Sequence, residues 1–199
     1  MGGSWLTEDQ GRTLPDLARR TIEMALGTGT LAEGGQPTGA QPDIAPWLEA
    51  PGAAFVTLHT RTGALRGCIG SLAARRALVE DIRANALAAA FEDPRFPALT
   101  ARELPDIVVE VSVLTAPEPL SYTDGRDLLT NLTPHVDGVI IEQGWHRATF
   151  LPQVWDQLPR PEGFLGHLCN KAGLPRSAWR SGDLKVSTYQ VQKFSEANA

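Results

Sequence analysis

The segment Leu65-Arg66-Gly67-Cys68-Ile69-Gly70 stands between a turn and a helix-forming run. Side chains alternate across a β-strand, so Arg66 and Cys68 are expected on one face, opposite Gly67. A guanidinium two residues from a thiol favours the thiolate, and the two glycines would let a ligand approach the backbone. The segment equally suits a structural strand, with Cys68 as a small buried hydrophobe and the glycines at a bulge or bend.

The flanking sequence predicts a hairpin followed by a helix and a further strand. Residues 53–60 are rich in β-branched and aromatic side chains and predict the first hairpin strand, with the turn at residues 61–63. Apolar residues recur with helical spacing from Leu78 to Ala90, and Asp93-Pro94 ends that helix. Residues 106–114 alternate in polarity and predict the clearest strand of the chain.

The second half of the chain repeats this order of elements. Residues 139–142 and 145–151 predict a hairpin around a Gln143-Gly144 loop, residues 162–172 predict a helix, and residues 185–194 predict the last strand. The repeated order suggests an internal duplication. Sequential hairpins imply an α+β fold, with an antiparallel or mixed sheet and helices packed on it.

The amino-terminal part predicts one amphipathic helix and then an irregular connection. Thr7 and Gln10 form a capping-box pattern, and apolar spacing continues to Leu26. Pro15 implies that the helix begins near Thr13 or bends there. Residues 28–52 are rich in Gly and Pro and predict a mobile surface connection, so a single domain is expected over residues 7–195.

Composition is that of an ordinary globular chain of 199 residues, 42% hydrophobic and 21% charged. Its net charge of −5 argues against non-specific electrostatic binding to nucleic acid or anionic lipid. The sequence contains no apolar run of the roughly 20 residues that a membrane helix needs and no basic-then-apolar leader, so a cytoplasmic protein is expected. The two cysteines, Cys68 and Cys169, imply no disulfide framework, and Cys169 falls on a helical core stripe.

Standard nucleotide, hydrolase and zinc motifs are missing, and the four histidines lack ligand-like spacing, so no metal is expected and no cofactor is indicated. What remains is a set of polar residues near strand ends. These candidates are Arg66, Cys68, Glu110, Ser112, Glu142 and Arg147. Each of them could equally be a solvated or paired sheet residue.

The amino-acid sequence of several segments resembles that of the AMMECR domain family, known in prokaryotes as protein A of the AmmeMemoRadiSam system. The family signature Leu-Arg-Gly-Cys-Ile-Gly stands here at residues 65–70 without a departure. Further matching blocks are Asp93–Pro97, Glu110–Leu114, Asp137–Val139, Phe150–Trp155 and Phe164–Pro175. The resemblance covers roughly residues 10–195, and the connection at 28–52 is longer than the family pattern implies.

The resemblance implies an α+β fold with a larger and a smaller subdomain around a cleft, but no established activity. It also implies association with a Memo-like protein, related to extradiol dioxygenases, and with a radical SAM protein. Two classes of function stay open. In the first, Cys68 is a nucleophile or redox thiol, Arg66 lowers its pKa or holds an anionic substrate, and Glu110 or Glu142 handles a proton.

In the second class, the same site is a non-catalytic binding or partner-interaction module. An unknown small molecule would then be held without any bond being made. The residues expected to contact the ligand are Gly67, Gly70, Ser112 and Arg147.

Overall fold

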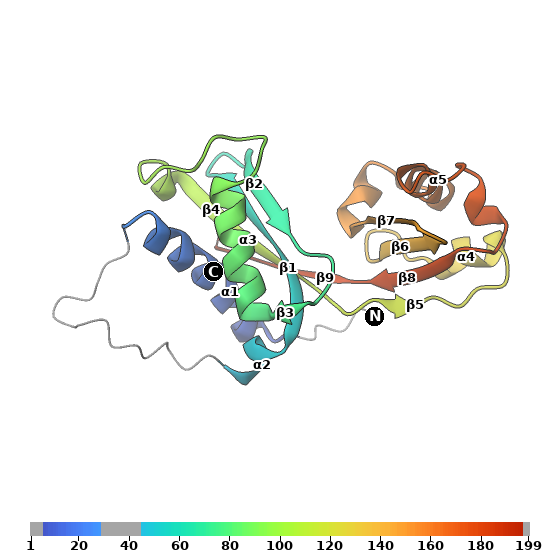
Figure 1. Ribbon diagram of the computed structural model, residues 1–199, viewed down its shortest axis with the longest axis horizontal. Coiled ribbons are helices and arrows are strands. Elements are labelled where there is room, and N and C mark those ends of the chain that lie inside the picture. The colour runs from blue at the N-terminus through green and yellow to red at the C-terminus, as the bar shows by residue number, and fades with distance from the viewer. Residues whose placement is uncertain (1–5, 29–44, 197–199) are drawn as a thin grey trace. The chain divides into compact units, whose positions relative to one another are not determined.

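The structure, a computed structural model, describes residues 6–28 and 45–196. The chain divides into two compact units (Figure 1). The first unit contains the described residues up to Leu114 together with residues 192–196, and the second unit is Thr115–Val191. Most of the connection predicted at residues 28–52 lies outside the described residues. Its described end is ordered, since it forms helix α2 (Pro46–Glu49) and the start of β1 at Pro51.

The first unit is built on a five-stranded sheet. Its main strands are β1 (Pro51–Thr60), β2 (Leu65–Gly70), β4 (Ile107–Leu114) and β9 (Val191–Ser195). They run in the order β2-β1-β4-β9, and the short strand β3 (Arg76–Ala77) pairs with the start of β1. Strand β1 lies between β2 and β4 and is antiparallel to both. It forms the predicted hairpin with β2.

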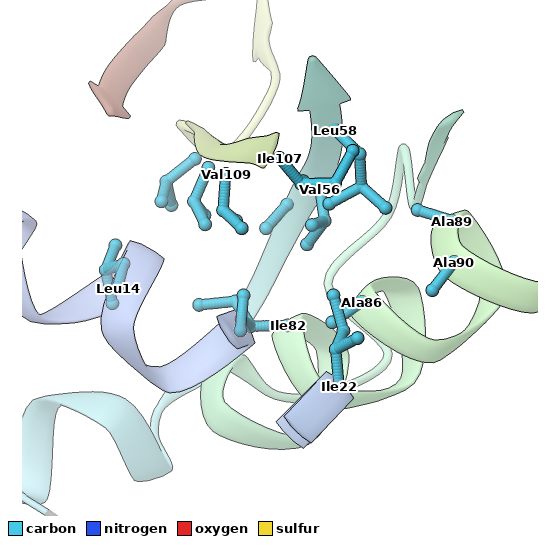
Figure 2. Packing of buried hydrophobic residues seen from close by; sticks show 14 of the residues in the cluster. Leu14, Ile22, Val56, Leu58, Ile82, Ala86, Ala89, Ala90, Ile107 and Val109 are labelled. Carbon is cyan, nitrogen blue, oxygen red and sulfur yellow. The ribbon is translucent and has the colours of Figure 1, made fainter. Parts of the chain in front are cut away.

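Helices α1 (Glu8–Ala25) and α3 (Leu78–Phe91) pack on one face of this sheet, and the short helix η1 (Leu104–Asp106) precedes β4. The core between them is aliphatic, with Val56 and Leu58 of β1 and Val109 of β4 fully buried against the helices (Figure 2). The helix α3 presents alanines to the sheet, which allows a close approach. One face of the sheet is therefore used for the core, and every second residue of each strand points to the other face.

Helix α1 starts as predicted. The Thr7 hydroxyl accepts the Gln10 amide N–H, and the Gln10 side chain accepts the Thr7 N–H in return, which forms the capping box. The expected start near Thr13 is wrong, because α1 already begins at Glu8. Pro15 lies inside the continuous helix and is buried, so its packing offsets the one backbone hydrogen bond that a proline cannot donate.

The second unit contains a four-stranded sheet in the order β5-β8-β6-β7. Its strands are β5 (Glu118–Pro119), β6 (Gly138–Gln143), β7 (His146–Phe150) and β8 (Lys185–Tyr189). Its helices are α4 (Gly125–Asn131), η2 (Pro152–Asp156), α5 (Pro161–Lys171) and η3 (Ala178–Arg180). The core is more aromatic than that of the first unit, with the Trp155 ring stacked on Phe164 at 3.7 Å between centroids.

Two details of the second half differ from the prediction. The hairpin loop is Gly144-Trp145, one residue later than expected, because Gly144 adopts the positive φ of 60° that the first position of this tight turn requires. The predicted last strand is interrupted at Gln190, and its two parts, β8 and β9, belong to different sheets.

The predicted α+β class and the repeated topology are confirmed. In each unit a hairpin is followed by a helix and a strand that returns antiparallel to the first hairpin strand, which gives β2-β1-β4 and β7-β6-β8. Among the described residues, no helix has the length and apolar character needed to span a membrane.

Candidate functional site

Cys68 lies on the face of the first sheet that points away from α1 and α3. Thr57 of β1 pairs directly with Cys68 of β2 on one side and with Glu110 of β4 on the other, so the three side chains share this face. The Thr57 hydroxyl donates a hydrogen bond to the Cys68 Sγ at 3.3 Å. Lys193 of β9 continues the line, with its Nζ 4.0 Å from Glu110 Oε1. We call Cys68, Thr57, Glu110 and Lys193 the polar row.

The polar row is partly accessible. Cys68 and Thr57 are half-buried, and the side chains of Glu110 and Lys193 are 23% and 46% exposed. Directly paired residues of antiparallel strands have Cβ atoms about 4.5–5.5 Å apart, so Thr57 has Cys68 as its neighbour on one side and Glu110 on the other. The Thr57 hydroxyl is therefore placed to donate a hydrogen bond to a thiolate at Cys68.

A second line of residues on the same face is closed by an aromatic ring. Ser112 pairs with Phe55, which pairs in turn with Gly70. A Cβ at Gly70 would lie 2.2 Å from the Phe55 ring, so the ring occupies the space beside this glycine. Ser112 is buried. The expectation that Gly70 leaves its backbone open to a ligand is therefore wrong.

Gly67 faces the helices and is needed for packing. A Cβ at this position would lie 2.1 Å from the backbone oxygen of Ala89 in α3. No side chain fits there unless the helix moves away from β2, so the glycine permits the close contact between the two elements. The expected role of Gly67 in ligand binding is not supported, since the helix fills the space that a ligand would need.

Arg66 is the extra residue of a β-bulge. Gly67 pairs with Leu58 and Leu65 pairs with His59, which leaves Arg66 without a partner on β1. The bulge breaks the regular alternation on which the expected neighbourhood of Arg66 and Cys68 rested.

The guanidinium of Arg66 is buried and directed to the loop before β4. Its Nε lies 3.0 Å from Glu103 Oε1, and its Nη2 donates to the Pro97 carbonyl at 2.9 Å. The hydrogen bond from Arg66 holds the pKa of Glu103 below its ordinary value. The Nη1 of Arg66 is buried and has no hydrogen-bond partner among the described residues.

The segment Asp93–Pro97 clasps the free edge of β2 at Cys68. The Asp93 carboxylate accepts the Cys68 backbone N–H at 2.9 Å, and Arg95 Nη2 donates to the Cys68 carbonyl at 3.3 Å. Hydrogen bonds from Arg95, together with that from the Cys68 N–H, hold the pKa of Asp93 well below its ordinary range. The role of this block as the backbone partner of Cys68 was not visible in the sequence.

Phe96 lies near two arginines of this local structure. The guanidinium carbons of Arg66 and Arg95 are 5.8 and 5.5 Å from the centre of its ring. The two family blocks at residues 65–70 and 93–97 therefore form one local structure. The signal available in the sequence was the pair of opposite charges on either side of Pro94. Asp93 and Arg95 suit a turn in which the aspartate pairs with the arginine.

The remaining candidates belong to the second unit. Glu142 of β6 is directly opposite Arg147 of β7, and Arg147 Nε lies 3.0 Å from Glu142 Oε1. Lys185 of β8 pairs with Glu142 on its other side. Both members of the ion pair are largely exposed, and such pairs contribute about 0–1 kcal/mol to stability. The ion pair of Glu142 with Arg147 therefore lies within the second unit, whereas Cys68 belongs to the first.

Cys169 is buried in the core of the second unit, as predicted, and burial raises the pKa of its thiol. Both cysteines are free, so they provide a half-buried and a fully buried thiol in one chain.

Residues 15–194 match the AMMECR1 family. The chain belongs to this family. The AMMECR1 match spans both compact units, and similar proteins occur in archaea. A protein of Thermofilum pendens is 40% identical over 96% of this chain and 92% of its own length. One from Methanothermobacter thermautotrophicus is 39% identical over 96% of both chains.

The fold is also similar to that of a protein of known structure. The crystal structure of the uncharacterized protein PH0010 from Pyrococcus horikoshii aligns with a TM-score of 0.77 and 36% identity. The alignment covers 96% of this chain and 93% of that one. This likeness supports the α+β fold.

Proposed function

We propose that this AMMECR1 protein is a cysteine-dependent cytoplasmic enzyme whose reactive group is Cys68 in the polar row. The observation that carries the proposal is the hydrogen bond from the Thr57 hydroxyl to the Cys68 Sγ, with Glu110 directly across the next strand. A hydroxyl donor stabilises a thiolate, and the thiolate is the nucleophilic form of cysteine.

The step that this geometry favours is addition of sulfur to an electrophilic carbonyl carbon. The Cys68 thiol gives up its proton to the Glu110 carboxylate, and the Thr57 hydroxyl donates its hydrogen bond to the thiolate that forms. The new sulfur–carbon bond opens the carbonyl double bond, and the resulting oxyanion takes the proton back from Glu110. Lys193 stabilises the ionised carboxylate between turnovers.

Arg66 is the group that we assign to an anionic part of the substrate. Its Nη1 is a buried donor without a partner in the described part of the chain, and an unsatisfied buried donor costs about 1–3 kcal/mol. Arg66 lies on the same Phe96 ring as Arg95, which contacts the Cys68 carbonyl. A carboxylate or phosphate on the substrate would satisfy this donor.

We propose that the protein acts together with a Memo-like protein and a radical SAM protein. Membership of the AMMECR1 family supports this association, because the prokaryotic family is named for that system. The absence of intrachain disulfides between its two cysteines is in keeping with a reducing compartment.

A second candidate function is a binding module that holds a ligand or partner without making a bond. It is favoured by the environment of the thiol, because no imidazole forms a hydrogen bond with Cys68 in residues 6–28 and 45–196. In this case Cys68 would be a packing residue at the edge of the sheet.

The test is to express wild-type, Cys68→Ser and Cys68→Ala proteins together with the two proposed partners. The enzyme proposal predicts that both variants stay folded but no longer form the product that the wild-type protein forms with the two partners. It also predicts that they lack any covalent adduct that intact-mass spectrometry finds on wild-type Cys68. Full product formation with Cys68→Ala would contradict it and would favour the binding module. Cys169→Ala is the matched control, because it changes the other thiol.

A further inference from the structure

A pocket of about 450 Å³ lies in the second unit, between the start of α5 and the segment leading to η3. Its volume falls within the roughly 300–1,000 Å³ of sites that hold small organic ligands. All its lining residues lie between positions 160 and 180, so the pocket belongs to one compact unit and is separate from the polar row.

The lining of the pocket is strongly cationic. Arg160, Arg176 and Arg180 face a single acidic residue, Glu162, which leaves an excess of two positive charges with His167 neutral. The whole chain carries a net charge of −5, so this concentration of arginines is not a consequence of a basic composition.

The positive charges of the pocket are not neutralised by carboxylates. In the described part of the chain, Arg160 and Arg180 form no ion pair, and Arg176 donates a hydrogen bond to His167 Nε2 rather than to an acid. The Arg180 guanidinium lies over the Trp179 ring at 5.1 Å, which holds it at the pocket wall. By contrast, Arg66, Arg76 and Arg95 of the first unit are each paired with a carboxylate.

The backbone of α5 adds further donors at the same place. The helix begins without a side-chain cap, and Pro161 occupies its first turn. The first backbone N–H groups of an α-helix have no partner within the helix and carry its positive dipole end. A Cβ at Gly163, which lines the pocket, would meet no atom within 4 Å, so there is open space beside this residue.

We propose that this pocket binds a small molecule through a phosphate group. Arginine matches the oxygens of phosphate with paired N–H donors, and three guanidiniums together with helix N–H groups suit a tetrahedral dianion better than a single carboxylate. The space beyond the arginines accommodates the organic part of the ligand.

The test is a titration of the full-length protein with inorganic phosphate, followed by isothermal calorimetry at constant ionic strength. Arg176→Gln and Arg180→Gln should each weaken phosphate binding about tenfold, because each removes a charge-assisted hydrogen bond. Arg102→Gln is the matched control, since Arg102 is exposed, belongs to the first unit and has no ion-pair partner in the described chain. Its affinity should equal that of the wild type.

A second variant keeps the test independent of arginine packing. Gly163→Glu places a carboxylate in open space at the mouth of the pocket and should abolish phosphate binding while the protein keeps its melting temperature to within a few degrees. Three results would overturn the proposal: no binding at millimolar phosphate, equal losses in Arg102→Gln, or acetate binding as tightly as phosphate.

Discussion

At the scale of single residues, the environment of Cys68 is set by backbone contacts as much as by side chains. Asp93 and Arg95 bind its N–H and its carbonyl, and Thr57 binds its sulfur. The sequence indicated a charged neighbour for Cys68 but named Arg66, because strand alternation places residues two apart on one face. A bulge cannot be recognised from such a count, and the arginine beside the Cys68 carbonyl comes from a loop 27 residues away.

Asp93 should make stability depend on pH. Its pKa is lowered in the folded protein, so its stabilising effect is complete above its ordinary value of 3.8 and is lost as the pH falls further. Asp93→Asn should lower the free energy of unfolding by about 2 kcal/mol at pH 7, the size of a lost charge-assisted hydrogen bond. Urea unfolding at pH 7 and pH 3 would measure the difference, which should shrink at pH 3.

The matched control for Asp93→Asn is Asp106→Asn. The Asp106 side chain is 79% exposed, and its carboxylate is as far as 3.8 Å from the Arg61 Nε. Loss of this exposed ion pair should change stability by less than about 1 kcal/mol. An Asp93→Asn effect that is equal at both pH values would show that the carboxylate charge of Asp93 is not what stabilises the clasp.

At the scale of elements, helix α3 is fixed to the sheet by polar as well as apolar contacts. The buried Asp81 carboxylate accepts hydrogen bonds from the Ala54 N–H, the Ser71 hydroxyl and Arg76, and Asn85 donates to both Asp81 and the Ala54 carbonyl. Helical spacing predicted the apolar stripe of α3. It could not predict this network, because its partners come from β1 and from the residues after β2.

Gly67 tests how closely α3 must approach β2. Gly67→Ala should lower the free energy of unfolding by about 1–3 kcal/mol, since the new methyl group would overlap the Ala89 carbonyl. Gly163→Ala in α5 is the control, because a Cβ there meets nothing within 4 Å and alanine favours a helix. Chemical denaturation of the two variants measures the contrast. A Gly67→Ala protein as stable as the wild type would mean that α3 is not held at this distance.

At the scale of the whole molecule, the order of elements was predictable and the assignment of strands to sheets was not. Repeated hairpin, helix and strand patterns predicted the common topology of the two units. The final strand was predicted as one element because the apolar pattern continues through Gln190, yet β8 and β9 join different sheets. Glu142 and Arg147 are polar strand residues, as Glu110 is, and nothing in the sequence assigns them to a different sheet from Cys68, yet they pair with each other in the second unit.

The candidate site was therefore predictable in part. Strand alternation placed Cys68 on one face with Glu110 and Ser112, but it expected them on the neighbouring strand, and β1 lies between β2 and β4. It gave no indication of Thr57, although Thr57 makes the direct contact with the sulfur. Strand pairing decides that contact, and the register between two strands is not visible in either strand alone.

The claim that the polar row is a reactive site is tested most directly by alkylation of the native protein with iodoacetamide at neutral pH. Peptide mass spectrometry would follow Cys68 and Cys169 separately. We predict that Cys68 reacts first and that Thr57→Val slows it about fivefold, the effect of one lost hydrogen bond to the thiolate, while Cys169 stays protected by burial and both thiols react equally in urea. A Cys68 that resists alkylation until the protein unfolds would contradict the account, because its thiol would then be structural.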